Sequence, residues 1–366
     1  MGNSMKKIKP YVITFFLFSH TIVWGQSECL IDPDIKANES NMMKSLERSD
    51  AVIVGEFHGV LGAFEIKLEL IKKLNREFGY NAVFMEIGKS AAYIYNLFLQ
   101  TGDITLLERP TMPYSIKKHE KEFWKYLYTY NESLTQNSRL KIYGVDFERL
   151  EFLKVLKLLI PKEYNTNNST FTKKLVNDYD TLIKSIDDYK EFNKLFKSYK
   201  NYFKDNLNEM RLIYGDNFHY LEDIFYNPAS QENFKERNEA MYENTFAAVS
   251  QNDIKKIIGF FGLNHTNSKK SYSLVGKLIN GTTFKNVINI SMVCKNCFDW
   301  QQYIKIAEYS GPYTYQRDKV LMESLFSKYF LPACKFTVIP TDAINDEKVK
   351  SFSNYLILLK DQPNFN

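Results

Sequence analysis

The sequence predicts an α/β fold, with a mostly parallel sheet flanked by helices and a large helical insertion. Short apolar runs that read as buried strands, residues 51–56 and 81–85 first, alternate with amphipathic helical segments. The first strand, helix and second strand follow one another within 35 residues, which is typical of a βαβ unit with parallel strands. Residues from about 149 to 250 then have helical character almost throughout. They indicate one sheet core that is interrupted by helices.

The remaining elements follow from the same patterns. Residues 64–78 carry apolar side chains close to helical spacing, and Gly79 supplies a helix stop, because glycine readily adopts the backbone conformation that ends helices. Further helices are predicted at residues 41–48, 91–100 and 118–134. Further strands are predicted at residues 140–145, 256–263, 286–293, 335–339 and 355–359. Strands from both sides of the insertion are therefore expected to complete the sheet.

The N-terminus has the layout of a secretory signal peptide. Three lysines precede an apolar stretch at residues 11–24, and small residues follow it. That stretch is shorter than the roughly 20 residues that span a bilayer. We expect residues 1–26 to be a cleaved signal peptide and residues 27–366 to form a single α/β catalytic-type domain, with the insertion at about 149–250. The mature protein is then exported, periplasmic or secreted; an uncleaved membrane anchor is the alternative.

Composition narrows the partners that this chain is expected to have. The net charge of +5 comes from scattered lysines without a basic block, which gives nucleic-acid binding no support. No stable membrane span is expected once the signal peptide is removed. The expected partner is a small-molecule substrate. Four cysteines in an exported chain fit two disulfides. The pair Cys294 and Cys297 is interpreted as a structural disulfide or free thiols ahead of redox chemistry or a zinc site.

Acidic and imidazole side chains follow the ends of four predicted strands. In chain order they are Glu56 with His58, Glu86, Asp146 with Glu148, and His265. Because the carboxyl ends of parallel strands meet at one edge of a sheet, we expect these groups to converge there. Such a set suits proton transfer, in which a histidine takes a proton from water while a carboxylate orients its ring. It also suits metal-assisted hydrolysis through histidine and glutamate ligands.

Five short motifs follow one another in a fixed order along the chain. They are Gly55–Glu56–x–His58–Gly59, the carboxylate Glu86 closing the next strand, Gly144–Val145–Asp146–Phe147, Arg237–Asn238–x–x–Met241, and Gly262–x–x–His265. Together, over roughly residues 50 to 290, they resemble the erythromycin esterase/ChaN/TIKI superfamily, with the erythromycin esterase-like branch favoured. That branch implies hydrolysis of an ester, typically a macrolide lactone, by a water activated through histidine, with no cofactor and no required metal.

The resemblance also implies roles for individual residues. As catalytic groups it implies Glu56, His58, Glu86 and His265, with the two histidines as candidate bases and the two glutamates orienting or polarising. As supporting or substrate-binding groups it implies Asp146, Glu148 and Arg237. No residue is assigned as a metal ligand.

Two departures from the esterase pattern keep other functions open. The spacing of Glu56 and His58 is one residue shorter than in the esterases and is closer to the ChaN-like branch, which is associated with haem or iron uptake. The family helix usually reads Arg–Asp, whereas this chain has Arg237 followed by Asn238. A haem- or iron-binding protein, a TIKI-like metal-dependent peptidase with a divalent metal, and a member that binds without reacting are therefore the alternatives.

Overall fold

The structure is a computed structural model that describes most of residues 36–360. The residues within that range that it does not describe are 58–59, 61, 109–117, 166–168, 182–188, 230–232, 299–304, 311–318, 331–335 and 351. The predicted signal peptide, His58 and two of the four cysteines, Cys29 and Cys334, therefore lie outside the described residues. None of the described helices is long and apolar enough to cross a membrane.

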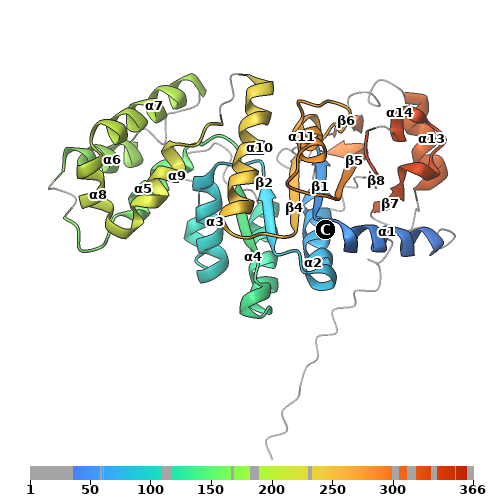
Figure 1. Cartoon of the computed structure of the whole chain (residues 1–366), viewed down its shortest axis with the longest axis horizontal. Helices are drawn as coiled ribbons and strands as arrows, with labels where there is room; N and C mark the ends of the chain where they lie inside the picture. The colour runs from blue at the N-terminus through green and yellow to red at the C-terminus, as the bar shows by residue number, and fades with distance from the viewer. Residues whose placement is uncertain are drawn as a thin grey trace, which may run out of the picture.

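The described residues form one sheet of eight strands (Figure 1). The strands are β1 (Ala51–Glu56), β2 (Ala82–Met85), β3 (Lys141–Gly144), β4 (Ile257–Gly262), β5 (Val287–Phe298), β6 (Lys305–Ser310), β7 (Phe336–Pro340) and β8 (Tyr355–Lys360). Their order in the sheet is β3–β2–β4–β1–β5–β8–β7, with β6 paired to β5. All neighbours pair in parallel except β5 with β6 and β7 with β8, which are antiparallel. The predicted mostly parallel α/β sheet is confirmed.

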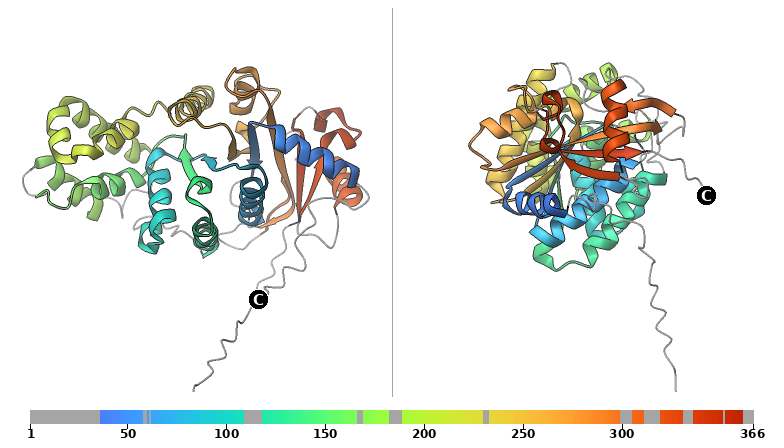
Figure 2. Two further views of the ribbon diagram at one scale, coloured as in Figure 1. Left: turned by 60° about the horizontal axis from the view of Figure 1, so that its bottom comes forward. Right: turned by 90° about the vertical axis from the view of Figure 1, so that its right-hand side faces the viewer.

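Helices cover both faces of this sheet (Figure 2). The described helices are α1 (Lys36–Arg48), α2 (Gly62–Phe78), α3 (Lys89–Thr101), α4 (Lys118–Glu132), α5 (Glu151–Leu159), α6 (Thr170–Thr181), α7 (Tyr189–Asp205), α8 (Leu207–Tyr214), α9 (Phe218–Phe225), α10 (Phe234–Gln251), α11 (Leu274–Asn280), α13 (Lys319–Tyr329) and α14 (Glu347–Lys350). The predicted stop of α2 is confirmed: Gly79 has φ of +74°, the left-handed conformation, and its N–H bonds the carbonyl of Asn75 at 3.0 Å.

The two faces have separate hydrophobic cores. In β1, Val52 and Val54 belong to the core that includes α1 to α4, whereas Ala51 and Ile53 belong to the core formed with α10 and α11. The connection after β1 therefore crosses the first face through α2, and the connection after β4 crosses the second face through α11. Neighbouring strands whose connections leave on opposite faces open a crevice at their carboxyl ends, where α/β proteins bind ligands. The carboxyl ends of β1, β4 and β2 are therefore where the topology places a ligand site.

The predicted helical insertion lies between β3 and β4. Helices α5 to α9 form a lobe to one side of the sheet, as Figures 1 and 2 show, and α5 and α9 pack against α3. Aromatic rings fill this lobe: Phe152 lies edge-on to Tyr199 at 5.6 Å, and Phe203 packs on Phe225 at 4.9 Å between ring centroids. Helix α10 then returns the chain to the sheet. The insertion therefore adjoins the edge of the sheet that β3 forms, through α3.

Candidate active site

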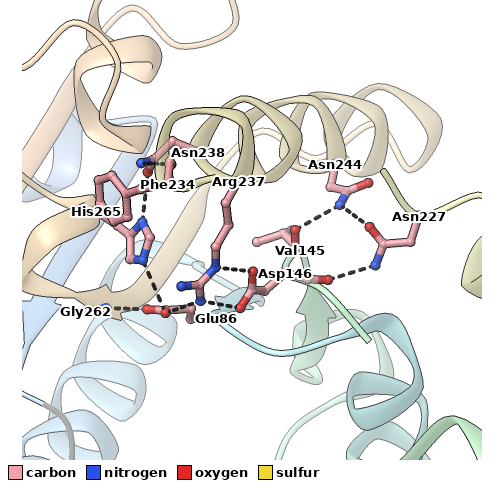
Figure 3. Close-up of polar contacts among 10 residues, drawn as sticks. All are labelled: Glu86, Val145, Asp146, Asn227, Phe234, Arg237, Asn238, Asn244, Gly262 and His265. Atoms are coloured by element: carbon pink, nitrogen blue, oxygen red, sulfur yellow. Dashed lines mark hydrogen bonds and ion pairs between the residues drawn. The ribbon is translucent and has the colours of Figure 1, made fainter. Parts of the chain in front are cut away.

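Glu86 lies at the centre of a polar cluster at the carboxyl edge of the sheet (Figure 3). It directly follows β2, and 9 % of its side chain is exposed. Its Oε1 accepts a hydrogen bond from Arg237 Nη2 at 2.6 Å, and its Oε2 accepts one from the backbone N–H of Gly262 at 2.6 Å. His265 Nε2 lies 3.3 Å from Oε1. The carboxylate therefore joins the end of β2 to α10 and to the end of β4.

Helix α10 brings three side chains to this cluster from one face. Asn233 begins the helix as its N-cap, because its side chain accepts two backbone N–H groups of the first turn. Phe234, Arg237 and Asn238 then follow at spacings of three and four residues, which places them side by side on a helix. Close packing of α10 on the sheet turns this face toward the ends of β2, β3 and β4 (Figure 3).

Arg237 binds two carboxylates at once. Its Nε donates to Asp146 Oδ1 at 2.8 Å, and its Nη2 donates to Asp146 Oδ2 at 2.5 Å as well as to Glu86. This two-bond geometry is the strong form of an arginine–carboxylate pair. Burial by itself lowers the pKa of Arg237, but its hydrogen bonds and charge interactions with Asp146 and Glu86 outweigh burial and raise that pKa. Within the described part of the chain, no hydrogen bond from the third nitrogen, Nη1, is found, and the guanidinium lies 4.9 Å from the ring of Phe147.

His265 ends the short turn that follows β4 and is buried. Its Nδ1 lies 2.8 Å from Asn238 Oδ1, and its Nε2 faces Glu86. The ring of Phe234 stacks on the imidazole, with 4.8 Å between ring centroids and 28° between planes. Both nitrogens and one face of the ring are thus contacted, which fixes the position of His265.

Glu148 lies next to this cluster, and its hydrogen bonds are to Lys89, Ser90 and Asn227. It accepts hydrogen bonds from the backbone N–H groups of Lys89 and Ser90, at the start of α3, at 2.9 and 3.1 Å. Asn227 donates to Glu148 at 3.1 Å and to the backbone carbonyl of Asp146 at 2.8 Å. Burial raises the pKa of Glu148 above its ordinary value, although these hydrogen bonds oppose that change. Glu148 therefore ties the end of the insertion to α3 and to the strand end that carries Asp146.

Glu56 lies apart from this cluster. It is the last residue of β1 and has the same parity as Val52 and Val54, so its side chain lies on the α2 face of the sheet. There Lys67 of α2 contacts both carboxylate oxygens of Glu56, at 3.1 and 3.0 Å. Of the seven predicted site residues, the structure brings together Glu86, Asp146, Arg237 and His265, with Glu148 behind them. Glu56 lies on the other face, and His58 falls outside the described residues.

The described residues do not offer a metal site at this edge. No three histidine, cysteine, aspartate or glutamate side chains among them are arranged to hold a metal ion. The donor chemistry gives the reason: Arg237 lies between Glu86 and Asp146 and already supplies the cation that these two carboxylates face. A divalent metal would have to displace the guanidinium to use both carboxylates as ligands.

Three residues of the site were missing from the sequence-based set. Phe234 stacks on His265, Asn238 bonds its Nδ1, and Asn227 joins Glu148 to Asp146. Asn238 belongs to the Arg237–Asn238 motif itself, and Phe234 lies three residues before Arg237 and four before Asn238, so a helix places the Phe234 ring beside both. Asn227 is 79 and 81 residues from its partners Glu148 and Asp146 in the sequence, and no local pattern predicts these contacts.

Comparison with known proteins supports the fold. A scan of the sequence against protein-family models gives no match, and neither does a search of curated proteins. The chain is similar to the structure of a Bacillus cereus protein, with 15 % identity, 88 % of this chain and 91 % of that one covered, and a TM-score of 0.50. It is likewise similar to a succinoglycan biosynthesis protein, with 14 % identity, 90 % and 91 % covered, and a TM-score of 0.50. A mutant erythromycin esterase in its open conformation aligns with 10 % identity over 88 % and 93 % of the two chains, at a TM-score of 0.49.

At these identities the likeness is one of fold. The chain is an α/β protein with a helical insertion, and it shares this architecture with the first two structures along most of their length. A carboxylate–arginine–histidine cluster at the carboxyl edge of the sheet is what the structure itself adds.

Proposed function

We propose that this chain is an exported hydrolase of the erythromycin esterase-like type, which cleaves an ester or lactone with a water activated by histidine. The observation that carries the proposal is the geometry of His265. Its Nδ1 is held by Asn238 at 2.8 Å, and its Nε2 faces the Glu86 carboxylate at 3.3 Å. An imidazole that is oriented on one nitrogen and faces a carboxylate with the other is arranged for proton transfer.

The proposed reaction uses the cluster as follows. Nε2 of His265 takes a proton from a water whose oxygen attacks the carbonyl carbon of the ester. Negative charge then develops on the carbonyl oxygen, and Nη1 of Arg237 is the donor available to it, because Nε and Nη2 hold the carboxylates. The C–O bond to the alcohol breaks as the intermediate collapses, and His265 returns its proton to the leaving oxygen. Glu86 faces Nε2 and stabilises the imidazole once it is protonated.

Two other residues complete the proposal. Phe234, which is 38 % exposed, offers an apolar ring surface next to His265, and such a surface suits the apolar part of an ester or macrolide. His58 remains the second candidate base, on the basis of the sequence motif alone. Export rests on residues 1–26, and N-terminal sequencing of the protein recovered outside the cytoplasm tests it.

The test is hydrolysis of a panel of macrolides and simple esters by the mature chain. A general base contributes about 10²- to 10⁴-fold to rate, so His265→Ala is expected to lower kcat/KM by at least that lower amount. His58→Ala is measured alongside it. His219→Ala is the matched control, because His219 is an exposed histidine of α9, and its loss is expected to leave kcat/KM within about twofold of the parent.

The outcomes separate the proposal from its alternatives. Hydrolysis that is unchanged in both His58→Ala and His265→Ala contradicts it. Activity that chelators remove and a divalent metal restores favours the metal-dependent peptidase. A Soret band shift on titration with haem, without turnover of any ester, favours the haem-binding alternative.

A further inference from the structure

Asn238 occupies the position at which the helix of the superfamily that this chain resembles usually has an aspartate. The contacts of Asn238 define the direction of its amide group. The backbone N–H of Leu274 donates to Asn238 Oδ1 at 3.1 Å, and Asn238 Nδ2 donates to the backbone carbonyl of Phe234 at 2.8 Å. A backbone N–H can only donate, and a backbone carbonyl can only accept. The two ends of the amide are therefore distinguished by groups whose roles cannot change, and the oxygen must face Leu274 and His265.

This direction settles that Nδ1 of His265 carries a hydrogen. Asn238 Oδ1 is an acceptor, and His265 Nδ1 lies 2.8 Å from it, a normal hydrogen-bond length. Nδ1 must therefore be the donor. In a neutral imidazole with hydrogen on Nδ1, the other nitrogen, Nε2, carries a lone pair.

The contact of Nε2 with Glu86 agrees with a lone pair at that position. The two hydrogen bonds that Glu86 accepts from Arg237 and Gly262 are both 2.6 Å long, whereas Nε2 lies 3.3 Å from Oε1. A charged N–H donor to a carboxylate is usually found at about 2.7–2.9 Å. The longer distance is consistent with a nitrogen that does not donate to Glu86.

We propose that Asn238 is a positioning residue that holds His265 in the tautomer with hydrogen on Nδ1 and so makes Nε2 the proton-accepting nitrogen. The tautomer stands on the hydrogen bonds alone, whereas its effect on rate rests on the proposed hydrolysis. Replacement of the aspartate in a Ser-His-Asp triad by asparagine abolishes most activity, because the amide then favours the wrong tautomer. Here Leu274 and Phe234 prevent that outcome, because they keep the NH₂ group of Asn238 away from His265. The asparagine thus supplies the orientation that an acid would supply, without its charge.

The experiment is two-bond ¹H–¹⁵N correlation NMR at about pH 8 on the mature chain labelled at its histidines. His265→Gln identifies the signals of His265. The expected result is a protonated, pyrrole-like Nδ1 and an unprotonated, pyridine-like Nε2. In Asn238→Ala the acceptor is gone, and we expect hydrogen on Nε2, where it can bond Glu86. Asn238→Asp keeps an acceptor and is expected to restore hydrogen on Nδ1.

The matched control is Asn244→Ala. Asn244 is a buried asparagine of the same helix that donates to Val145 and Asn227 and has no contact with His265 given by the structure. We expect this variant to keep hydrogen on Nδ1, which separates loss of the acceptor from loss of a buried amide. Hydrogen on Nε2 in the parent chain overturns the proposal, and so does a doubly protonated ring in the parent or an unchanged tautomer in Asn238→Ala. The parent spectrum alone decides the matter if Asn238→Ala does not fold.

Kinetics distinguish the tautomer from the reaction. If the chain hydrolyses an ester, Asn238→Ala is expected to lower kcat by at least tenfold with KM within twofold, and Asn238→Asp is expected to recover most of that loss. An Nδ1–H tautomer in a chain that hydrolyses nothing rejects the proposed function and leaves the positioning role intact. An Nε2–H tautomer in an active esterase rejects the positioning role and leaves the proposed function intact.

Discussion

The replacement Arg237→Met tests whether the cluster at the sheet edge is held by one buried cation. Arg237 is 14 % exposed and makes two hydrogen bonds to Asp146, whose side chain has no exposed surface, and one to Glu86. Methionine replaces the aliphatic part of the arginine side chain and has no charge, so it keeps the packing of that part and removes the cation. Two buried carboxylates would then face each other without a counter-charge.

The expected cost is large because the charges are buried. Two unit charges about 4 Å apart interact by about 4 kcal/mol at an effective dielectric constant of about 20. Removal of one partner of a buried ion pair typically costs about 3–5 kcal/mol, because the other charge remains buried. We expect Arg237→Met to lower the free energy of unfolding by an amount in that range. Asp146→Asn alone is expected to cost less, about 1.5–3 kcal/mol, since Arg237 keeps Glu86.

Urea unfolding followed by circular dichroism measures these costs, and the double variant measures their coupling. Arg237→Met/Asp146→Asn is expected to lose at least about 2 kcal/mol less than the sum of the single variants, because the second change removes the charge that the first left unpaired. Arg76→Met is the control: Arg76 is 66 % exposed, pairs with Glu77 at 3.8 Å, and is expected to matter by less than about 1 kcal/mol. A cost for Arg237→Met no larger than that of the control, or single costs that simply add, refutes the reasoning.

Two predictions concern pH. Burial raises the pKa of Glu148 in the folded state above its value of 4.5 in the unfolded chain, so the folded state binds the proton more tightly, and stability declines as pH rises above about 4.5. The unfolding free energy of the parent relative to Glu148→Gln should therefore fall in urea titrations as pH rises above about 4.5, and a constant difference contradicts this. Burial likewise raises the pKa of Tyr80 to about 12. The charge of Asp50 adds to this increase, whereas the hydrogen bond with Ser49 opposes it. Above the unfolded value of about 10 the parent should lose stability more steeply than Tyr80→Phe, and parallel curves would count against it.

The sheet was predictable because its central strands are continuous apolar runs bounded by glycine and charge. Some of the elements that the sequence patterns missed are weaker: β6 mixes charged and apolar residues on the antiparallel side of β5, and α11 is seven residues long. The 11-residue α13 was missed as well. Short helices carry too few turns for periodicity to stand out. The same limit explains α14, which has four residues.

The sequence predicted the edge of the sheet at which the site lies. It did not predict on which face of the sheet each side chain lies. Convergence of Glu86, Asp146 and His265 follows from parallel strands: the structure joins Glu86 to Asp146 through Arg237 and places His265 Nε2 beside Glu86. The face on which Glu56 lies does not follow, because a strand buried on both sides is apolar at every position and carries no sign of which residues point which way. Glu56 is the last residue of β1, whereas Glu86 comes one residue after β2, and that single step in parity assigns them to opposite faces.

The hydrogen bond from the backbone of Gly262 to Glu86 has a consequence for how the fold can be monitored. This amide proton is held by a side chain 176 residues earlier in the sequence, not by a backbone carbonyl. Its exchange with solvent deuterium should therefore slow only when the ends of β2 and β4 have come together, which makes it a single-residue clock for the late, long-range step of folding. Because the Gly262 amide is protected only when Glu86 is in place, its exchange rate reports assembly of the cluster without the need for a substrate.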